Sequence, residues 1–188
     1  MNFVLASASE RRQELLKRIV DEFTVMVSNF DEGLIKNTDS VSDYVQNIAF
    51  GKAKDIMNGV KKDSIIIAAD TVVSLEGKVL GKPKDKEEAY NMLSSLSNNV
   101  HKVYTGVVVI NTKTQVVLKD YVETKVFFSK LTSEEINAYI ETGDPFDKAG
   151  AYGIQGKAGV FIEKIEGCYY NVVGLPLNKL NEMIKEVY

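Results

Sequence analysis

The hydrophobic and polar positions of this chain change their period several times, and each change predicts a new element. Ile65, Ile66 and Ile67 lie in a continuous apolar run at residues 64–69, which is typical of a central strand buried on both faces. Residues 102–110 and 115–128 are rich in β-branched and aromatic side chains and flank a polar turn, so we expect a long antiparallel pair. Further strands are predicted at residues 2–6, 24–30, 72–75, 78–80 and 160–165, with a hairpin turn at Glu76 and Gly77.

Capping residues and helical spacing predict helices between these strands. Ser7 and Glu10 have the spacing of a capping box for a helix that ends near Ile19. Residues 41–57 carry apolar side chains at helical spacing, with Lys52 on their apolar side. Further helices are predicted at residues 86–95, from Thr132 to Gly143 and from Pro176 onward, and residues 31–40 read as a polar loop.

The interleaving of helices, strands and hairpins predicts an α/β fold with a mixed central sheet flanked by helices. A length of 188 residues with 45% hydrophobic residues suits one globular domain over residues 1–188. A shape with two lobes and a cleft would suit the polar motifs that lie near both ends of the chain.

Composition excludes several classes of function. A net charge of −3 argues against a sequence-independent nucleic-acid binder. The single cysteine, Cys168, cannot form an intramolecular disulfide, and as a nucleophile it would need the single histidine, His101, as its base. The first apolar stretch is too short for a signal peptide, and no run of about 18 apolar residues is found. We therefore expect a soluble, cytoplasmic protein without a membrane partner.

The N-terminal motif Ser7-Ala8-Ser9-Glu10-Arg11-Arg12 joins a predicted strand to a predicted helix. Free N–H groups at a helix start attract an anion. Arg11 and Arg12 oppose the helix dipole there unless an anion compensates them. The motif suits a bound phosphate and a capped helix with two solvated arginines equally well.

Two acidic positions suit a divalent metal. Asp70 follows the apolar run, where a buried strand is predicted to end, and can bind a metal, accept a proton from water, or cap the next turn. Glu32 follows the strand predicted at residues 24–30. Mg²⁺ prefers a few carboxylates completed by water and phosphate oxygens, so Glu32 and Asp70 are the predicted metal pair.

Cations and small residues supply the remaining candidates. Lys82 lies between Gly81 and Pro83, which fix the backbone around it, and both Lys82 and Lys52 suit a phosphate or plain solvation. Residues 147–156 combine three glycines with an acid, a cation and Gln155, whose amide can read a base edge. We interpret the small residues as room for a ligand beside the backbone.

Together these motifs resemble the Maf family of nucleoside triphosphate pyrophosphatases. The resemblance runs from Leu5-Ala6-Ser7 to Asn171-Val172-Val173-Gly174-Leu175-Pro176-Leu177, nearly the whole chain. It implies an inosine-triphosphatase-like fold with two lobes and a cleft, cleavage of a nucleoside triphosphate to monophosphate and pyrophosphate with Mg²⁺ or Mn²⁺, and a homodimer. Ala69-Asp70-Thr71 and Tyr152-Gly153-Ile154-Gln155-Gly156 resemble the branch that acts on dTTP and UTP.

By this resemblance Asp70 is the proton acceptor, and Arg12, Thr71 and Gln155 determine substrate specificity. Ser7, Arg11, Glu32, Lys52 and Lys82 fall on further positions that the family uses in its site. The chain departs from the family at Glu10, where proline is usual.

The resulting hypothesis is a metal-assisted attack of water on the α-phosphorus, with the cations binding the triphosphate. One competing hypothesis is a nucleotide-binding regulator of cell division with vestigial hydrolysis. Another is a phosphatase that forms a phospho-aspartate, but Asp70-Thr71-Val72 lacks the D-x-D arrangement of such enzymes. The sequence leaves open the physiological nucleotide, the metal, and a role in pool cleaning or in division control.

Overall fold

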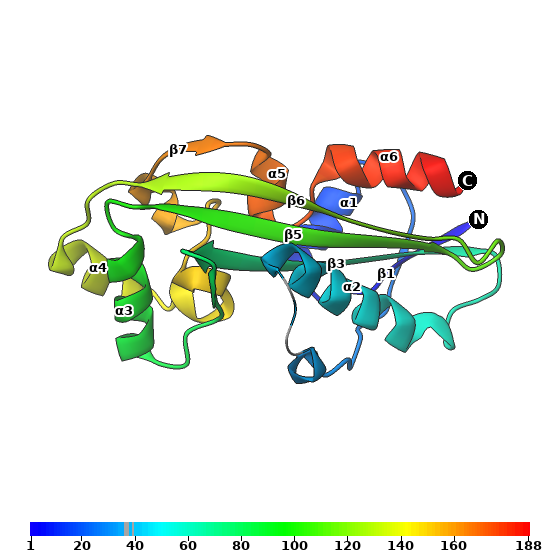
Figure 1. Cartoon of the computed structure of the whole chain (residues 1–188), viewed down its shortest axis with the longest axis horizontal. Helices are drawn as coiled ribbons and strands as arrows, with labels where there is room; N and C mark the ends of the chain where they lie inside the picture. Colours follow the sequence, from blue (N-terminus) through cyan, green and yellow to red (C-terminus); the bar gives the residue numbers. More distant parts are fainter. Residues whose placement is uncertain (36–37, 39) are drawn as a thin grey trace. The chain divides into compact units, whose positions relative to one another are not determined.

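The computed structural model describes residues 1–35, 38 and 40–188 (Figure 1). The strands are β1 (Asn2–Leu5), β2 (Thr24–Val25), β3 (Ser64–Leu75), β4 (Lys78–Leu80), β5 (Val100–Asn111), β6 (Val117–Phe128) and β7 (Ile162–Glu166). The α-helices are α1 (Glu10–Leu16), α2 (Val41–Met57), α3 (Lys86–Leu96), α4 (Ser133–Ile140), α5 (Tyr169–Val173) and α6 (Leu177–Val187). Short 3₁₀ helices are η1 (Glu32–Leu34), η2 (Asp144–Asp147), η3 (Ala149–Ala151) and η4 (Lys157–Phe161).

The strands form a seven-stranded sheet in the order β2-β1-β3-β5-β6-β7, with β4 beside β3. β1 pairs in parallel with both β2 and β3, and β4 and β7 pair antiparallel with β3 and β6. The predicted mixed sheet flanked by helices is therefore confirmed.

The chain forms two compact units. Unit 1 comprises Met1–Asp70, Thr105–Val122 and Gly174–Tyr188, and unit 2 comprises Thr71–Tyr104 and Glu123–Val173. The division into two lobes matches the prediction, whereas the cleft and the single-domain organisation stay predictions.

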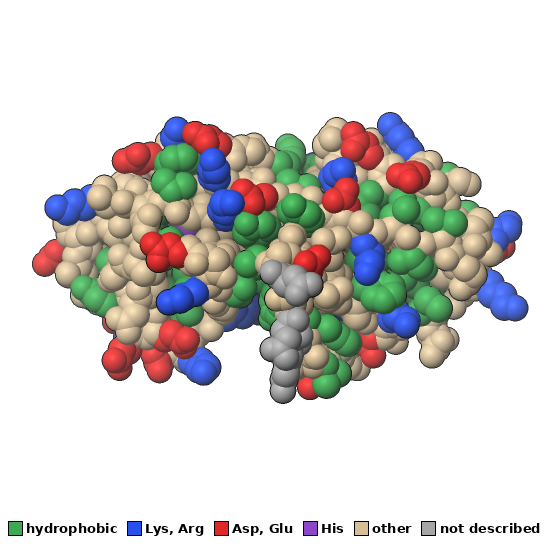
Figure 2. All heavy atoms as spheres, viewed as in Figure 1, with side chains coloured by type: hydrophobic (Ala, Val, Ile, Leu, Met, Phe, Trp, Pro, Cys, Tyr) green, Lys and Arg blue, Asp and Glu red, His purple; other side chains and the backbone are tan. Residues whose placement is uncertain are grey.

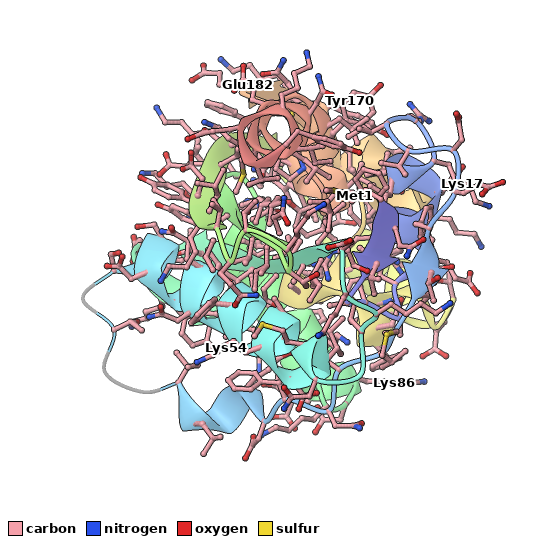
Figure 3. All side chains as sticks on the ribbon, turned by 90° about the vertical axis from the view of Figure 1, so that its right-hand side faces the viewer. Met1, Lys17, Lys54, Lys86, Tyr170 and Glu182 are labelled. Carbon is pink, nitrogen blue, oxygen red and sulfur yellow. The ribbon has the colours of Figure 1, made fainter. Side chains whose placement is uncertain are left out.

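Unit 1 is built around a sheet with helices on both faces. Alternate residues of β1 and β3, such as Val4 and Ile66, pack with Ala49 and Ala53 of α2 in one apolar cluster. Helix α6 covers the other face, so Lys54 of α2 and Glu182 of α6 lie on opposite sides of this unit (Figure 3). This arrangement follows from the β3 sequence, whose side chains from Ile65 to Ala69 are all fully buried.

Unit 2 has its own core of apolar and aromatic side chains. Helices α3 and α4 pack together and contribute Leu93 and Ile136. The rings of Phe128 and Tyr152 lie edge to face, with their centroids 4.8 Å apart. The predicted hairpin joins β3 to β4, where Glu76 and Gly77 both have positive φ, as a tight two-residue turn requires.

Several predicted boundaries are wrong, each for a local reason. The cap of α1 is Ser9 rather than Ser7, because the Ser9 side chain accepts from the Arg12 N–H. β2 ends at Val25, and β3 continues through Asp70 to Leu75. Helix α4 ends at Ile140, three residues before the αL residue Gly143. The predicted loop at residues 31–40 contains η1, and its residues 36, 37 and 39 lie outside the described residues.

The surface carries mixed charge. Figure 2 shows acidic and basic side chains interspersed over the face that it draws, with apolar side chains between them. Within the described part of the chain, no helix has both the length and the apolar character needed to cross a membrane.

Candidate functional site

Asp70 lies inside β3, between the stretch that pairs with β1 and the stretch that pairs with β4. The parallel pairing of β1 ends at Leu5 opposite Ile67, and the antiparallel pairing of β4 begins at Val73. The prediction that the strand of residues 64–69 ends before Asp70 is therefore wrong, because β3 continues through Asp70 to Leu75. Only 10% of the Asp70 side chain is exposed, so the fold buries this carboxylate beyond the carboxyl end of β1.

Helix α2 brings Lys52 to Asp70. Ser40 caps the helix by accepting from the Asp43 N–H, and the apolar side of α2 packs on the sheet. Lys52 extends from this side, and its Nζ lies 2.7 Å from Asp70 Oδ1 and 2.7 Å from Glu32 Oε1. The predicted candidates Glu32, Lys52 and Asp70 therefore form one cluster, here called the acid–lysine cluster.

Glu32 reaches this cluster because its segment docks on α2. It lies in η1, capped by Asp31, and not directly after a strand as predicted. A Cβ atom at Gly51 would lie 2.3 Å from Phe30 Cζ, so the Phe30 ring fills the space that Gly51 leaves on the helix. One turn further along α2, Asp55 accepts hydrogen bonds from the Ser28 hydroxyl and the Asn29 N–H.

Burial dominates the electrostatics of Asp70. It raises the pKa of the carboxyl group, while the positive charges of Lys52 and Arg12 and the Lys52 hydrogen bond oppose the shift. A buried carboxylate that holds its proton more tightly than usual is a candidate general base.

The N-terminal motif contributes Arg12, whose side chain is fixed at two points. Its Nε donates to the Gly174 carbonyl oxygen at 2.8 Å, and its Nη1 donates to Ser7 Oγ at 3.4 Å. Burial lowers the pKa of Arg12, the Asp70 charge raises it, and the neighbouring Arg11 charge lowers it. Ser7, Arg11 and Arg12 thus lie in unit 1 together with the acid–lysine cluster.

Sequence reasoning missed two contributors. Tyr44 lies eight residues before Lys52, on the same side of α2, and its pKa is raised by burial and then by the charges of Asp70 and Glu32. Helical spacing from Lys52 would have found it. Gly174 has a φ of 121°, and its carbonyl anchors Arg12.

The acid–lysine cluster offers two carboxylates to a divalent metal. Among residues 1–35, 38 and 40–188, no group of three or more His, Cys, Asp or Glu side chains is arranged to hold a metal ion. The oxygens of Glu32 and Asp70 both bond Lys52 Nζ, so they lie within two hydrogen-bond lengths of each other. Two carboxylates fit Mg²⁺ when substrate phosphates and water complete its ligands.

Three predicted site residues belong to unit 2. Thr71 is half-buried beside Asp70 in the chain, and Lys82 and Gln155 are exposed. The Gly150 N–H donates to the Gly81 carbonyl at 3.0 Å, which joins the loop of Lys82 to the segment that leads to Gln155.

Close packing within unit 2 explains why residues 147–156 include small residues. Gly150 has a φ of 67°, and a Cβ there would lie 2.8 Å from Val73 Cγ2. A Cβ at Gly153 would lie 2.8 Å from Lys148 Cδ. The prediction that they make room for a ligand is therefore not needed to explain them.

His101 does not serve Cys168 as a base. Its Nε2 shares a hydrogen bond of 2.6 Å with the Tyr152 hydroxyl, and burial lowers its pKa to about 4. The backbone of Cys168 exchanges hydrogen bonds with Thr124 Oγ1. His101 is therefore held by Tyr152, and Cys168 is held through its backbone by Thr124.

The fold and the site define the class of protein: an α/β protein with a mixed sheet and a cluster of one buried aspartate, one lysine and a second carboxylate. The sequence profile of the Maf-like protein family matches residues 2–187, and the chain belongs to this family. The dTTP/UTP pyrophosphatase of Clostridium botulinum (strain Alaska E43 / Type E3) is 61% identical over 186 residues, 99% of each chain. That of the Okra strain is 57% identical over 188 residues, 99% of this chain and 97% of the relative.

Solved structures show the same fold at low sequence identity. The Ham1 protein of Staphylococcus aureus has a TM-score of 0.56 at 15% identity and covers 100% of both chains. A HAM1 protein from Coxiella burnetii has a TM-score of 0.50 at 13% identity, with 99% of both chains covered. The expected relation to the inosine-triphosphatase-like fold is confirmed.

Proposed function

We propose that this protein is a nucleoside triphosphate pyrophosphatase that hydrolyses dTTP and UTP to the monophosphate and pyrophosphate. The observation that carries the proposal is the acid–lysine cluster, in which Lys52 bonds both Glu32 and the buried Asp70. Full-length relatives at 56–61% identity are dTTP/UTP pyrophosphatases, which supports this substrate class.

Asp70 is the proposed general base. It accepts a proton from the water that attacks the α-phosphorus, and its raised pKa brings its proton affinity closer to that task. Glu32 and Asp70 would hold Mg²⁺ or Mn²⁺, which supplies a water of lowered pKa and offsets phosphate charge. The departing pyrophosphate takes the electron pair of the broken P–O bond.

The cations have separate proposed roles. Lys52 holds the two carboxylates together, and its remaining N–H can be donated to a phosphate oxygen. Arg11 and Lys82 bind the triphosphate together with the Ser7 hydroxyl. Arg12, Thr71 and Gln155 select the pyrimidine. These roles rest on the family resemblance and on the chemistry of the side chains.

Product analysis tests the proposal. Purified protein with Mg²⁺ or Mn²⁺ should release pyrophosphate and monophosphate fastest from dTTP or UTP among canonical triphosphates. Asp70→Asn should lower kcat by at least about 10²-fold, because a general base contributes that much, and should leave the circular dichroism spectrum unchanged.

Three other outcomes would contradict the proposed pyrophosphatase activity or its mechanism. Release of orthophosphate would mean that a different bond is broken, and near-normal kcat in Asp70→Asn would remove Asp70 as the base. Nucleotide binding without turnover would favour a regulator of cell division instead. A homodimer and a cytoplasmic location stay predictions, the first testable by sedimentation of the purified protein.

A further inference from the structure

Lys148 is a mostly buried cation whose hydrogen bonds go to its own segment of unit 2. Its side chain is 15% exposed, whereas that of Asp147 is 63% exposed. Its Nζ donates to Asp147 Oδ1 at 2.6 Å and to the Asp144 carbonyl oxygen at 2.7 Å. The ammonium group therefore closes the turn of η2, and the methylene stem is held in one direction.

The turn that carries Gln155 rests on this closed segment at both ends. The Gly156 N–H donates to the Gly153 carbonyl at 3.1 Å and closes the turn around Gln155. A Cβ at Gly153 would lie 2.8 Å from both Cδ and Cε of Lys148. A Cβ at Gly156 would lie 3.1 Å from Asp144 Oδ2. Two glycines thus let the turn lie directly on the Lys148 stem and the Asp144 carboxylate.

We propose that Lys148 is a positioning residue for substrate selection, because its stem supports the turn that holds Gln155. The inference rests on the proposed function, in which Gln155 reads the pyrimidine. The inference gives Lys148 a role in selecting the nucleobase. A lysine that bound phosphate would instead favour all nucleoside triphosphates equally. A small shift of a positioned group can cost up to about 100-fold in rate, so loss of this support is measurable.

Lys148→Met tests the inference, because methionine keeps most of the apolar stem but lacks the ammonium group that ties the stem to Asp144 and Asp147, so the stem no longer has a fixed direction. We expect kcat/KM for UTP and dTTP to fall relative to that for GTP, so that the ratio drops on the order of tenfold. The change should arise mainly in KM, with kcat nearly kept. Lys157→Met removes an exposed lysine of the adjacent η4 and should leave the ratio unchanged.

Coupling to Gln155 separates positioning from general structure. In a Gln155→Ala background, Lys148→Met should lower the nucleotide ratio no further, because the group that it positions is already gone. Gly153→Ala is a second variant, since its Cβ would lie 2.8 Å from the Lys148 stem, so the stem and the turn must separate, and it should lower the ratio in the same direction.

Three results would overturn the inference. An equal loss for UTP, dTTP and GTP would make Lys148 a phosphate ligand, and an unchanged ratio in both Lys148→Met and Gly153→Ala would remove its role. Additive effects with Gln155→Ala would show that Lys148 acts elsewhere. Failure of the wild-type protein to hydrolyse UTP or dTTP would overturn the proposed function as well, so the two failures are distinguishable.

Discussion

Lys52 sets the charge balance of the acid–lysine cluster, because its ammonium group bonds a buried and an exposed carboxylate at once. The Asp70 side chain is 10% exposed and the Glu32 side chain 52%. Burial raises the pKa of Asp70, while the charge of Lys52 and its hydrogen bond lower it. The proton affinity of the proposed base is therefore a balance that one substitution can shift.

Lys52→Gln should move the acid limb of the pH–rate profile to higher pH. Without the ammonium group the pKa of Asp70 rises further, so the base is lost at a higher pH as the solution is acidified. The measurement is log kcat/KM for dTTP from about pH 4.5 to about pH 8, a range that begins just above the ordinary carboxyl pKa values of roughly 4. Loss of the phosphate contact should cost a further ~1–3 kcal/mol at all pH values.

A neighbouring lysine provides the matched control. Lys54 lies on α2 with its Nζ 5.3 Å from the centroid of the Phe50 ring. Lys54→Gln should leave the acid limb where it is. An acid limb in Lys52→Gln that stays in place, or moves to lower pH, would contradict the assignment of Asp70 as the titrating base.

At the scale of single residues, the sequence predicts which side chains belong to the site but not which of them bond one another. The sequence predicts Asp70, Glu32 and Lys52 as site residues, although for each of them the residue pattern alone also allows capping or plain solvation and the family resemblance supplies the role. That one lysine bonds both acids depends on the docking of Phe30 on Gly51, a contact between segments that no local pattern reports. The prediction of Ser7 as the helix cap is wrong because a second serine, Ser9, lies two residues later and caps α1 instead.

At the scale of elements, the docking of residues 28–34 on α2 fixes where Glu32 lies. The Phe30 ring and the hydrogen bonds from Ser28 and Asn29 to Asp55 hold this segment on the helix. The segment contains little regular structure besides η1. Its position therefore depends on these few contacts.

Gly51→Ala should separate helix stability from activity. Alanine favours a helix over glycine by about 1 kcal/mol, so Tm should not fall strongly. Its Cβ would lie 2.3 Å from Phe30 Cζ, so the ring must move and Glu32 loses its support. We expect kcat/KM to fall on the order of tenfold, measured with dTTP.

A double-mutant cycle checks the cause of that loss. Phe30→Ala removes the ring that the new methyl group of Gly51→Ala would strike, so combining the two substitutions should cost little more activity than Phe30→Ala alone. Fully additive losses would mean that Gly51 acts through something other than Phe30.

The sequence predicts the bounds of α2 correctly, because a cap and a regular apolar spacing mark them. It does not predict the end of β3, a strand that changes its pairing partner along its length. α2 begins after a serine cap and keeps its apolar spacing throughout, so residues 41–57 were predicted as observed. β3 was cut short at Ala69 because Asp70 and Thr71 interrupt the apolar run. Inside the continuous strand, Lys52 of a distant helix donates to the Asp70 carboxylate, a partnership that the strand sequence does not reveal.

At the scale of the whole molecule, stability depends on pH through buried titratable groups. Burial lowers the pKa of His101 from its ordinary 6.5 to about 4. The unfolded chain therefore binds a proton that the folded protein refuses between about pH 6.5 and pH 4. His101 therefore contributes to the free energy of unfolding in full above pH 6.5, and this contribution is lost as the pH falls towards 4. Asp70, whose pKa is raised, acts in the opposite sense.

His101→Gln should reduce the loss of stability on acidification, because the glutamine amide does not titrate. The amide can still bond the Tyr152 hydroxyl. The Tm of the wild-type protein should exceed that of the variant most at neutral pH, and the difference should shrink as the pH falls towards 4. A difference that is constant with pH would mean that His101 is protonated in the folded protein as readily as in the unfolded chain.

The central claim for the whole molecule is that water attacks the α-phosphorus of a pyrimidine triphosphate. Hydrolysis of dTTP in water enriched in oxygen-18 tests it most directly, with mass spectrometry of both products. We expect the label in the phosphate of dTMP and none in pyrophosphate, and Asp70→Asn should form labelled dTMP at least about 10²-fold more slowly. Label in pyrophosphate would place the attack at the β-phosphorus and contradict the account.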